Sequence, residues 1–247
     1  MAVSVDTVYQ RVLAILNKEQ RGYVTPQEFN LFANQAMLDI FEQYFYDINQ
    51  FGRLPGNDTE FSDMLNILNE KINIFEKNAP MVATNPWTGK WKAPVDLYRL
   101  GTIAYTFSTT DGFGVTTSTT TEAERINYNE FLYINQSRYT KPVDSRPVFV
   151  VGDDGGVRYT VYGNSILETG VTCNYIKVPA AAAWGYQMVF GEALYDSTTS
   201  VDFELHESEE TELVIKILAL AGLAVQDIGM YQVANQIENQ TNQQEKQ

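Results

Sequence analysis

The chain has 247 residues, 31 of them acidic and 17 basic, which gives a formal net charge of -14. This charge excludes binding of nucleic acid through a broadly basic surface. A hydrophobic content of 44% and an aromatic content of 13% exclude a disordered chain. Cys173 is the only cysteine, so no intrachain disulfide is possible. The N-terminus lacks the pattern of a signal peptide and no apolar run reaches membrane length, so we expect a protein made in the cytoplasm, without membrane contact.

The first 80 residues are predicted to be helical. Apolar residues recur at helical spacing over 4–20. The capping box Thr25–Glu28, with Pro at the first helical position, then opens a second helix that is rich in Phe. A third helix is predicted over 60–77, with Thr59 as its cap. Three helices with one apolar face each predict a small antiparallel bundle.

Residues 81–202 are predicted to form an antiparallel β-rich part, because short β-branched and aromatic runs alternate with Gly, Pro, Asn and Asp. The Thr-rich stretch Ser108–Thr121 contains Asp111-Gly112 and predicts a protruding β-hairpin or a flexible loop. Further elements are predicted along this part: a short helix at 129–135, a hairpin turn at Asp153–Gly156, and strands at Ser165–Leu167 and Val171–Val178.

The segment Asp202–Ala224 joins an acidic run to a helix that is apolar on nearly every face. Ser208 is its predicted N-cap, with glutamates in the first turn, where the helix dipole favours them. The apolar part is too short to cross a bilayer. It must therefore be buried, either in the core of its own chain or between subunits, and the core position carries at least equal weight.

The predicted fold class is α+β. It has an N-terminal helical bundle (1–80), a central antiparallel β-rich region (81–202) and C-terminal helices (203–247) that pack back on the bundle. The last part is expected to form one helical domain with the first.

The inventory of reactive groups is poor, which predicts a protein that is not an enzyme and holds no metal or cofactor. His206 is the only histidine, and Glu210 stands where a zinc-protease motif would need a second one. Cys173 lies in an apolar run and is predicted to be a small buried side chain. Paired carboxylates for glycosidic cleavage stay possible among 31 acids, although no pair stands out.

Five stretches of the chain resemble structural proteins of tailed bacteriophages, and within that group the head–tail connector proteins, also called adaptor, ring or tail tubular proteins. The stretches are Lys18–Ala36, Ala93–Leu100, Ser145–Val151, Asn174–Tyr186 and Phe203–Asp227. The Thr-rich stretch Ser108–Thr121 has no counterpart in the resemblance.

The resemblance implies a homo-oligomeric ring, commonly of twelve copies, at the head–tail interface of the virion. Such a ring docks under the portal protein, joins downstream tail or ring proteins, and lets DNA pass without sequence-specific binding. On this basis subunit contacts are predicted at Phe29, Phe32, Phe41, Leu213, Ile217, Leu220, Ala221 and Leu223. Portal docking is predicted at Ile228, Met230, Val233, Ala234 and Ile237, the thin apolar stripe of a polar C-terminal helix.

Two other functions fit the sequence. One is a different ring or tail-tube protein of the same particle. The other is a tail component whose Tyr- and Trp-bearing β region binds or cleaves a host glycan.

Overall fold

The computed structural model describes residues 3–18, 24–51, 64–85, 89–110, 112–114, 116–153, 155–167, 169–224 and 236. The chain separates into two compact units. The helical unit comprises Met1–Ile74 and Pro179–Gln247, and the sheet unit comprises Phe75–Val178. The structure combines α-helices with one large β-sheet, which agrees with the predicted α+β class.

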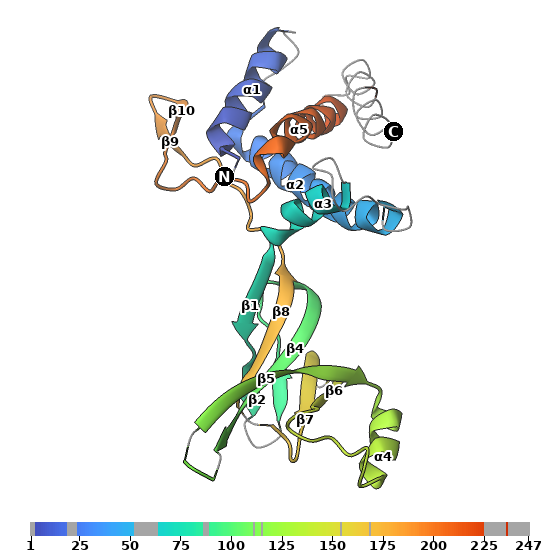
Figure 1. The fold of residues 1–247 in the computed structure, drawn as a ribbon. Helices are drawn as coiled ribbons and strands as arrows, with labels where there is room; N and C mark the ends of the chain where they lie inside the picture. The colour runs from blue at the N-terminus through green and yellow to red at the C-terminus, as the bar shows by residue number, and fades with distance from the viewer. Residues whose placement is uncertain are drawn as a thin grey trace. The chain divides into compact units, whose positions relative to one another are not determined.

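The helical unit holds four α-helices within its described residues (Figure 1). They are α1 (Val5–Lys18), α2 (Pro26–Phe51), α3 (Met64–Asn73) and α5 (Glu210–Ala224). The predicted capping box of α2 is confirmed. The Thr25 N–H donates to the Glu28 carboxylate at 2.9 Å, and the Glu28 N–H donates to the Thr25 hydroxyl at 3.3 Å.

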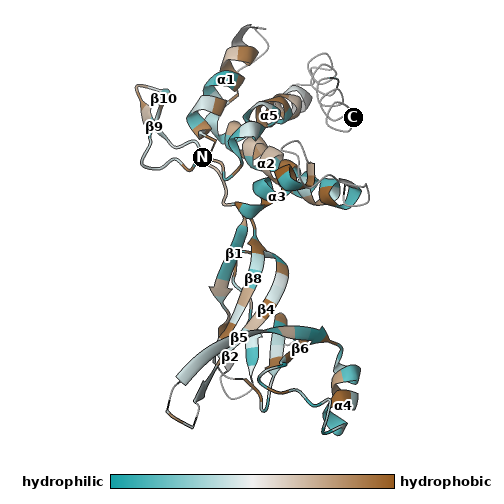
Figure 2. Cartoon of the chain, viewed as in Figure 1, coloured by the Kyte–Doolittle hydropathy of each residue, from teal (hydrophilic) through white to brown (hydrophobic). Residues whose placement is uncertain are grey.

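The core of this unit lies where the helices meet. Helix α5 contacts α1 and α2, and α2 contacts α3. Apolar and polar segments alternate along α2 (Figure 2), because one face of the helix is buried and the other is not. The largest fully buried side chains here are Phe29, Phe41, Met37, Ile40, Phe203, Leu205, Leu213 and Ile217.

The third helix is shorter than predicted. Helix α3 ends at Asn73, and the following residues form the strand β1 (Glu76–Pro80), so the predicted continuation to Lys77 is wrong. Strand β1 pairs antiparallel with β8 (Val171–Lys177), and Glu76 lies opposite Ile176. A pairing partner so distant in sequence outweighs the local helical pattern. The predicted cap Thr59 lies outside the described residues.

The sheet unit is built on one eight-stranded, nearly closed sheet with the order β1-β8-β4-β5-β6-β7-β3-β2. Neighbouring strands are antiparallel except β5 and β6, which are parallel. Met81 alone separates the two edge strands β1 and β2 in sequence. The remaining strands are β2 (Val82–Asn85), β3 (Lys90–Lys92), β4 (Leu97–Thr110), β5 (Thr116–Ile126), β6 (Val148–Asp153) and β7 (Val157–Tyr162).

The Thr-rich hairpin is confirmed as β4 and β5. Its outer half carries facing hydroxyls, with Thr106 and Thr120 at 2.9 Å and Thr110 and Thr116 at 3.1 Å. Gly170, at φ +76°, brings its backbone against this hairpin, and its carbonyl accepts from the Thr106 N–H at 2.9 Å. A side chain at position 170 would collide with the Thr106 carbonyl.

Two more elements of the sheet unit agree with the sequence, and one does not. Helix α4 (Tyr128–Gln136) confirms the predicted short helix and provides the connection from β5 to the parallel strand β6. The Asp153 carboxylate accepts from the Gly156 N–H at 2.8 Å in the predicted turn. The predicted strand at Ser165–Leu167 is wrong, since it forms a single bridge between Tyr162 and Ile166.

No helix in the described part of the chain is both long and apolar enough to cross a bilayer.

Candidate functional site

The residues predicted to join subunits are mostly buried within the chain itself. The side chains of Phe32 and Leu220 stay partly accessible, while nothing is described of the Leu223 side chain. Five others have at most 1% of their surface exposed, so they offer no accessible area to a second copy: Phe29, Phe41, Leu213, Ile217 and Ala221. The subunit contact therefore stays a prediction, while the structure gives α5 a place in the core of the helical unit.

The predicted portal-docking residues cannot be placed. Ile228, Met230, Val233, Ala234 and Ile237 all lie outside the described residues. Their docking role stays a prediction.

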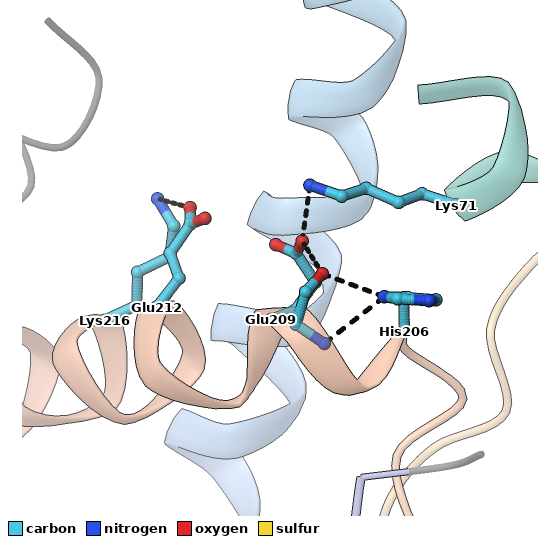
Figure 3. A network of polar contacts seen from close by, with 6 residues as sticks. Lys71, His206, Glu209, Glu212 and Lys216 are labelled. Atoms are coloured by element: carbon cyan, nitrogen blue, oxygen red, sulfur yellow. Dashed lines mark hydrogen bonds and ion pairs between the residues drawn. The ribbon is translucent and has the colours of Figure 1, made fainter. Parts of the chain in front are cut away.

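An ion pair anchors the acidic segment that immediately precedes α5. Lys71 of α3 places its Nζ atom 2.6 Å from a carboxylate oxygen of Glu209, whose side chain is 4% exposed (Figure 3). The Ser208 hydroxyl donates to the same carboxylate oxygen at 3.0 Å. The Lys71 ammonium also lies over the Tyr44 ring, 5.7 Å from its centroid. Part of the acidic run thus holds α3 against the short segment that precedes α5.

The N-cap of the helical segment that leads into α5 is not the predicted residue. Helix α5 begins at Glu210 and is preceded by the 3₁₀ helix η2 (Glu207–Glu209), so Ser208 is not the N-cap. His206 occupies the cap position, and its Nδ1 accepts from the Ser208 N–H at 3.3 Å. The extra 3₁₀ turn moves the start of the helical segment two residues earlier than the local pattern indicates. The only histidine of the chain therefore has a structural partner.

Two asparagines of α2 fix the backbone that follows the sheet unit in sequence. The side-chain amide of Asn34 donates to the Ala182 carbonyl and accepts from the Ala182 N–H, both at 2.9 Å. The Asn30 side-chain oxygen accepts from the Trp184 N–H at 2.8 Å. The Trp184 indole N–H in turn donates to Asp6 of α1 at 2.9 Å. The backbone of Ala182 and Trp184 is therefore held by side chains of α2, while Ala183 between them pairs through its own backbone with Val201.

This fixed segment leads into a small hairpin formed by β9 (Tyr186–Val189) and β10 (Glu192–Tyr195). Its two-residue turn has positive φ at both positions, +51° at Phe190 and +88° at Gly191, as in a type I′ turn. Phe190 is the only non-glycine residue with positive φ in the described chain, and its side chain is fully exposed. Asn or Gly usually occupies a position with positive φ. The backbone conformation of Phe190 is therefore unfavourable for the stability of the hairpin.

The hairpin carries a cluster of exposed apolar side chains. We name this group the hairpin tip: Met188, Val189, Phe190, Leu194 and Tyr195, all exposed. It borders an open hollow of about 670 Å³ whose other wall is the start of α2 at Pro26 and Gln27. The sequence analysis missed this tip. The signal that could have found it is a Phe-Gly pair between two short runs that are rich in large apolar residues.

Asp196 fastens the base of the hairpin. Its carboxylate accepts from the Thr198 hydroxyl at 2.6 Å, the Gln187 side chain at 2.9 Å and the Thr198 N–H at 2.9 Å. These hydrogen bonds, with that of the Thr198 hydroxyl as the largest cause, lower the pKa of Asp196 from 3.8 to about 2.

We expect this fastening to be lost only in strong acid. A folded-state pKa below the unfolded value means that the carboxylate contributes its full stabilisation above about pH 4 and loses it as the pH falls through about 2. A carboxyl-carbon NMR titration should show a midpoint for Asp196 near 2, and Thr198→Val should raise it. A midpoint near the ordinary value in the wild-type chain would contradict the fastening.

The described residues offer little reactive chemistry. No group of three or more His, Cys, Asp or Glu within them could hold a metal ion. Cys173 is buried as predicted, and burial raises the pKa of its thiol to about 11, so the thiol stays protonated at neutral pH. Tyr175 donates its hydroxyl proton to Asp96 at 2.9 Å, and burial followed by this bond raises the pKa of Tyr175 to about 12.

Charge is divided unevenly between the two units. The helical unit contains 21 acidic and 7 basic residues, and the sheet unit contains 10 of each. The whole net charge of -14 therefore falls on the helical unit, while the sheet unit is neutral. Two helical units repel each other because both are acidic. This charge distribution therefore favours a contact between the helical unit of one molecule and the sheet unit of another.

No protein-family model matches the chain, and no curated protein matches it either.

Proposed function

We propose that the chain is a non-enzymatic structural protein of a tailed-phage virion. In this proposal it forms a head–tail connector ring between the portal and the tail, and the DNA exit channel runs through the ring. Its helices form one bundle, with the C-terminal helices packed back on the N-terminal ones. The basis in sequence is the resemblance of five stretches, which include Lys18–Ala36 and Phe203–Asp227.

The exposed, strained Phe190 is the observation that most supports a role in protein contact. A left-handed conformation costs a non-glycine residue about 1 kcal/mol. Full exposure of a phenylalanine ring adds nothing to the stability of the free chain. A residue that is unfavourable in both respects is best explained by a contact that is made in an assembly.

The charge distribution supports the passage of DNA. A helical unit with 21 acidic residues against 7 basic ones repels phosphates, so DNA close to it would move without being held.

Imaging of the purified chain tests the proposal directly. The chain would be mixed with the portal protein of its own phage and examined by negative-stain electron microscopy, alone and in the mixture. We expect closed rings, either free or seated on the portal. A chain that stays monomeric in both samples and does not bind the portal would count against the connector function.

Phe190→Gly separates contact from stability. The substitution removes the exposed ring and relieves the left-handed strain, so the chain should be as stable as before or up to about 1 kcal/mol more stable. Loss of an aromatic anchor of an interface costs about 2 kcal/mol, which is roughly thirtyfold in affinity. We therefore expect thermal unfolding to be unchanged or shifted upward, while ring formation with the portal is reduced.

Val95 offers a matched control, because it is 96% exposed and lies in the sheet unit. Val95→Ser should alter neither stability nor ring formation. If Phe190→Gly assembles as well as Val95→Ser, the hairpin tip has no role in the ring.

A further inference from the structure

Helix α4 exposes one of its faces. Its inner face packs on the sheet, where the Phe131 ring stacks on Tyr162 with centroids 4.1 Å apart. No residue of the helix is fully buried. On its outer face and in the loop that follows, Tyr133 is 75% and Tyr139 is 89% exposed. Exposed tyrosines that are this close in sequence are typical of protein contact sites.

The loop after α4 adds exposed positive charge. Arg138 and Lys141 are exposed, and neither makes an ion pair with any residue that the structure describes. The Arg146 guanidinium donates to the Tyr139 carbonyl at 3.4 Å, which ties the two ends of the loop together. We name this surface the α4 patch: Tyr128, Leu132, Tyr133, Arg138, Tyr139 and Lys141.

Helix α2 has an exposed face that combines apolar side chains with negative charges. Residues at spacings of three and four lie on one face of a helix, and here that face points away from the core side chains of α2. On this face Leu31 is 71% and Tyr46 is 66% exposed, and α2 contains no Lys or Arg. We name this surface the α2 stripe: Glu28, Leu31, Leu38, Asp39, Glu42 and Tyr46, all exposed.

We propose that the α4 patch of one copy docks on the α2 stripe of a second copy. The α4 patch combines exposed apolar side chains with two positive charges, and the α2 stripe combines them with three negative charges. Glu130 of α4 is exposed beside the patch and offsets one of its positive charges. The patch belongs to the sheet unit and the stripe to the helical unit. The contact is therefore head-to-tail, and such a contact closes into a ring or continues as a filament. This inference rests on the proposed function, for which it names the surfaces between subunits.

Charge reversal in the full-length chain tests the contact. Sedimentation velocity would measure self-association of concentrated protein at low and at high salt. We expect the wild-type chain to associate at low salt, and Arg138→Glu with Lys141→Glu to weaken this association about tenfold or more. Lys92→Glu with Arg99→Glu makes the same charge change at exposed sites outside the patch and should have a much smaller effect.

The second part of the experiment reverses the charges of the α2 stripe as well, so that the two surfaces again carry opposite charges. Asp39→Lys with Glu42→Lys should weaken association by itself, and the chain that carries both reversed pairs should associate again. A wild-type chain that remains monomeric at low salt, or a combined variant that is not rescued, would overturn the contact. So would a reversal that abolishes binding to a fluorescent DNA oligonucleotide and leaves self-association unchanged, since nucleic acid would then be the occupant.

The outcome is distinguishable from that of the connector proposal. If the reversed variants still form rings on the portal, only this docking surface is wrong. If the salt-dependent association follows the charge pattern but no ring forms with the portal, the connector function is wrong and the surface stands.

Discussion

Replacement of Lys71 by methionine is expected to lower the free energy of unfolding by about 3 kcal/mol. The Glu209 carboxylate is 4% exposed, and the ammonium of Lys71 at 2.6 Å is its cationic partner. Methionine keeps the packing of the aliphatic part of the lysine side chain. It leaves the buried Glu209 carboxylate without its cationic partner, and among the described residues the Ser208 hydroxyl then remains as its side-chain hydrogen-bond donor. The measurement is urea unfolding followed by far-UV circular dichroism, which reports mainly on the helices.

Arg11→Met is the matched control for this prediction. Arg11 also pairs with the start of α5, at 3.1 Å from Glu210, but its side chain is 53% exposed. Exposed pairs contribute at most about 1 kcal/mol, so the control should lose much less stability. Conversion of both partners, Lys71→Met with Glu209→Leu, should recover most of the loss, because no unpaired charge stays buried. If Lys71→Met costs no more than Arg11→Met, the anchoring role of this pair is contradicted.

Ile217→Ala is expected to lower the free energy of unfolding by about 3 kcal/mol, and by the same amount at every protein concentration. Ile217 is fully buried within the chain, so its truncation leaves a cavity in the core of the helical unit. A side chain that acted only between subunits would instead give a stability loss that depends on concentration. Denaturation at two widely separated protein concentrations distinguishes these cases.

Ile215 supplies the comparison on the same helix. It is half-buried, so Ile215→Ala should cost less than Ile217→Ala. If the loss of stability in Ile217→Ala disappears when the protein is diluted, α5 is a contact between subunits and not part of the core of one chain.

The elements that the sequence predicted well are those with local signals. The capping box at Thr25–Glu28 fixes the start of α2, and Asp153 with Gly156 fixes a turn, because each signal is complete within four residues. Helix α4 likewise follows from a short local pattern.

The elements that the sequence analysis missed depend on distant partners. Strand β1 exists because Glu76 and its neighbours pair with β8, far along the chain. The hairpin tip is positioned by Asn30 and Asn34, whose side chains bind the backbone of residues 182–184. No periodicity in the segment itself reveals such contacts.

The role of α5 shows a different limit of sequence analysis. An all-round apolar helix is compatible with a core and with a subunit interface, and its composition does not distinguish the two. The structure buries Leu213, Ile217 and Ala221 within the chain. The surfaces that we propose for assembly are instead exposed ones: the hairpin tip, the α4 patch and the α2 stripe. The α4 patch and the α2 stripe mix apolar and charged residues, which makes them inconspicuous in the sequence.

A reconstruction of the virion that resolves this chain tests the central claim most directly. The account predicts a ring of copies at the portal vertex, with the tip around Phe190 in contact with another protein and α5 inside each subunit. Copies located away from the portal vertex, with residues 186–195 facing solvent on every side, would contradict it.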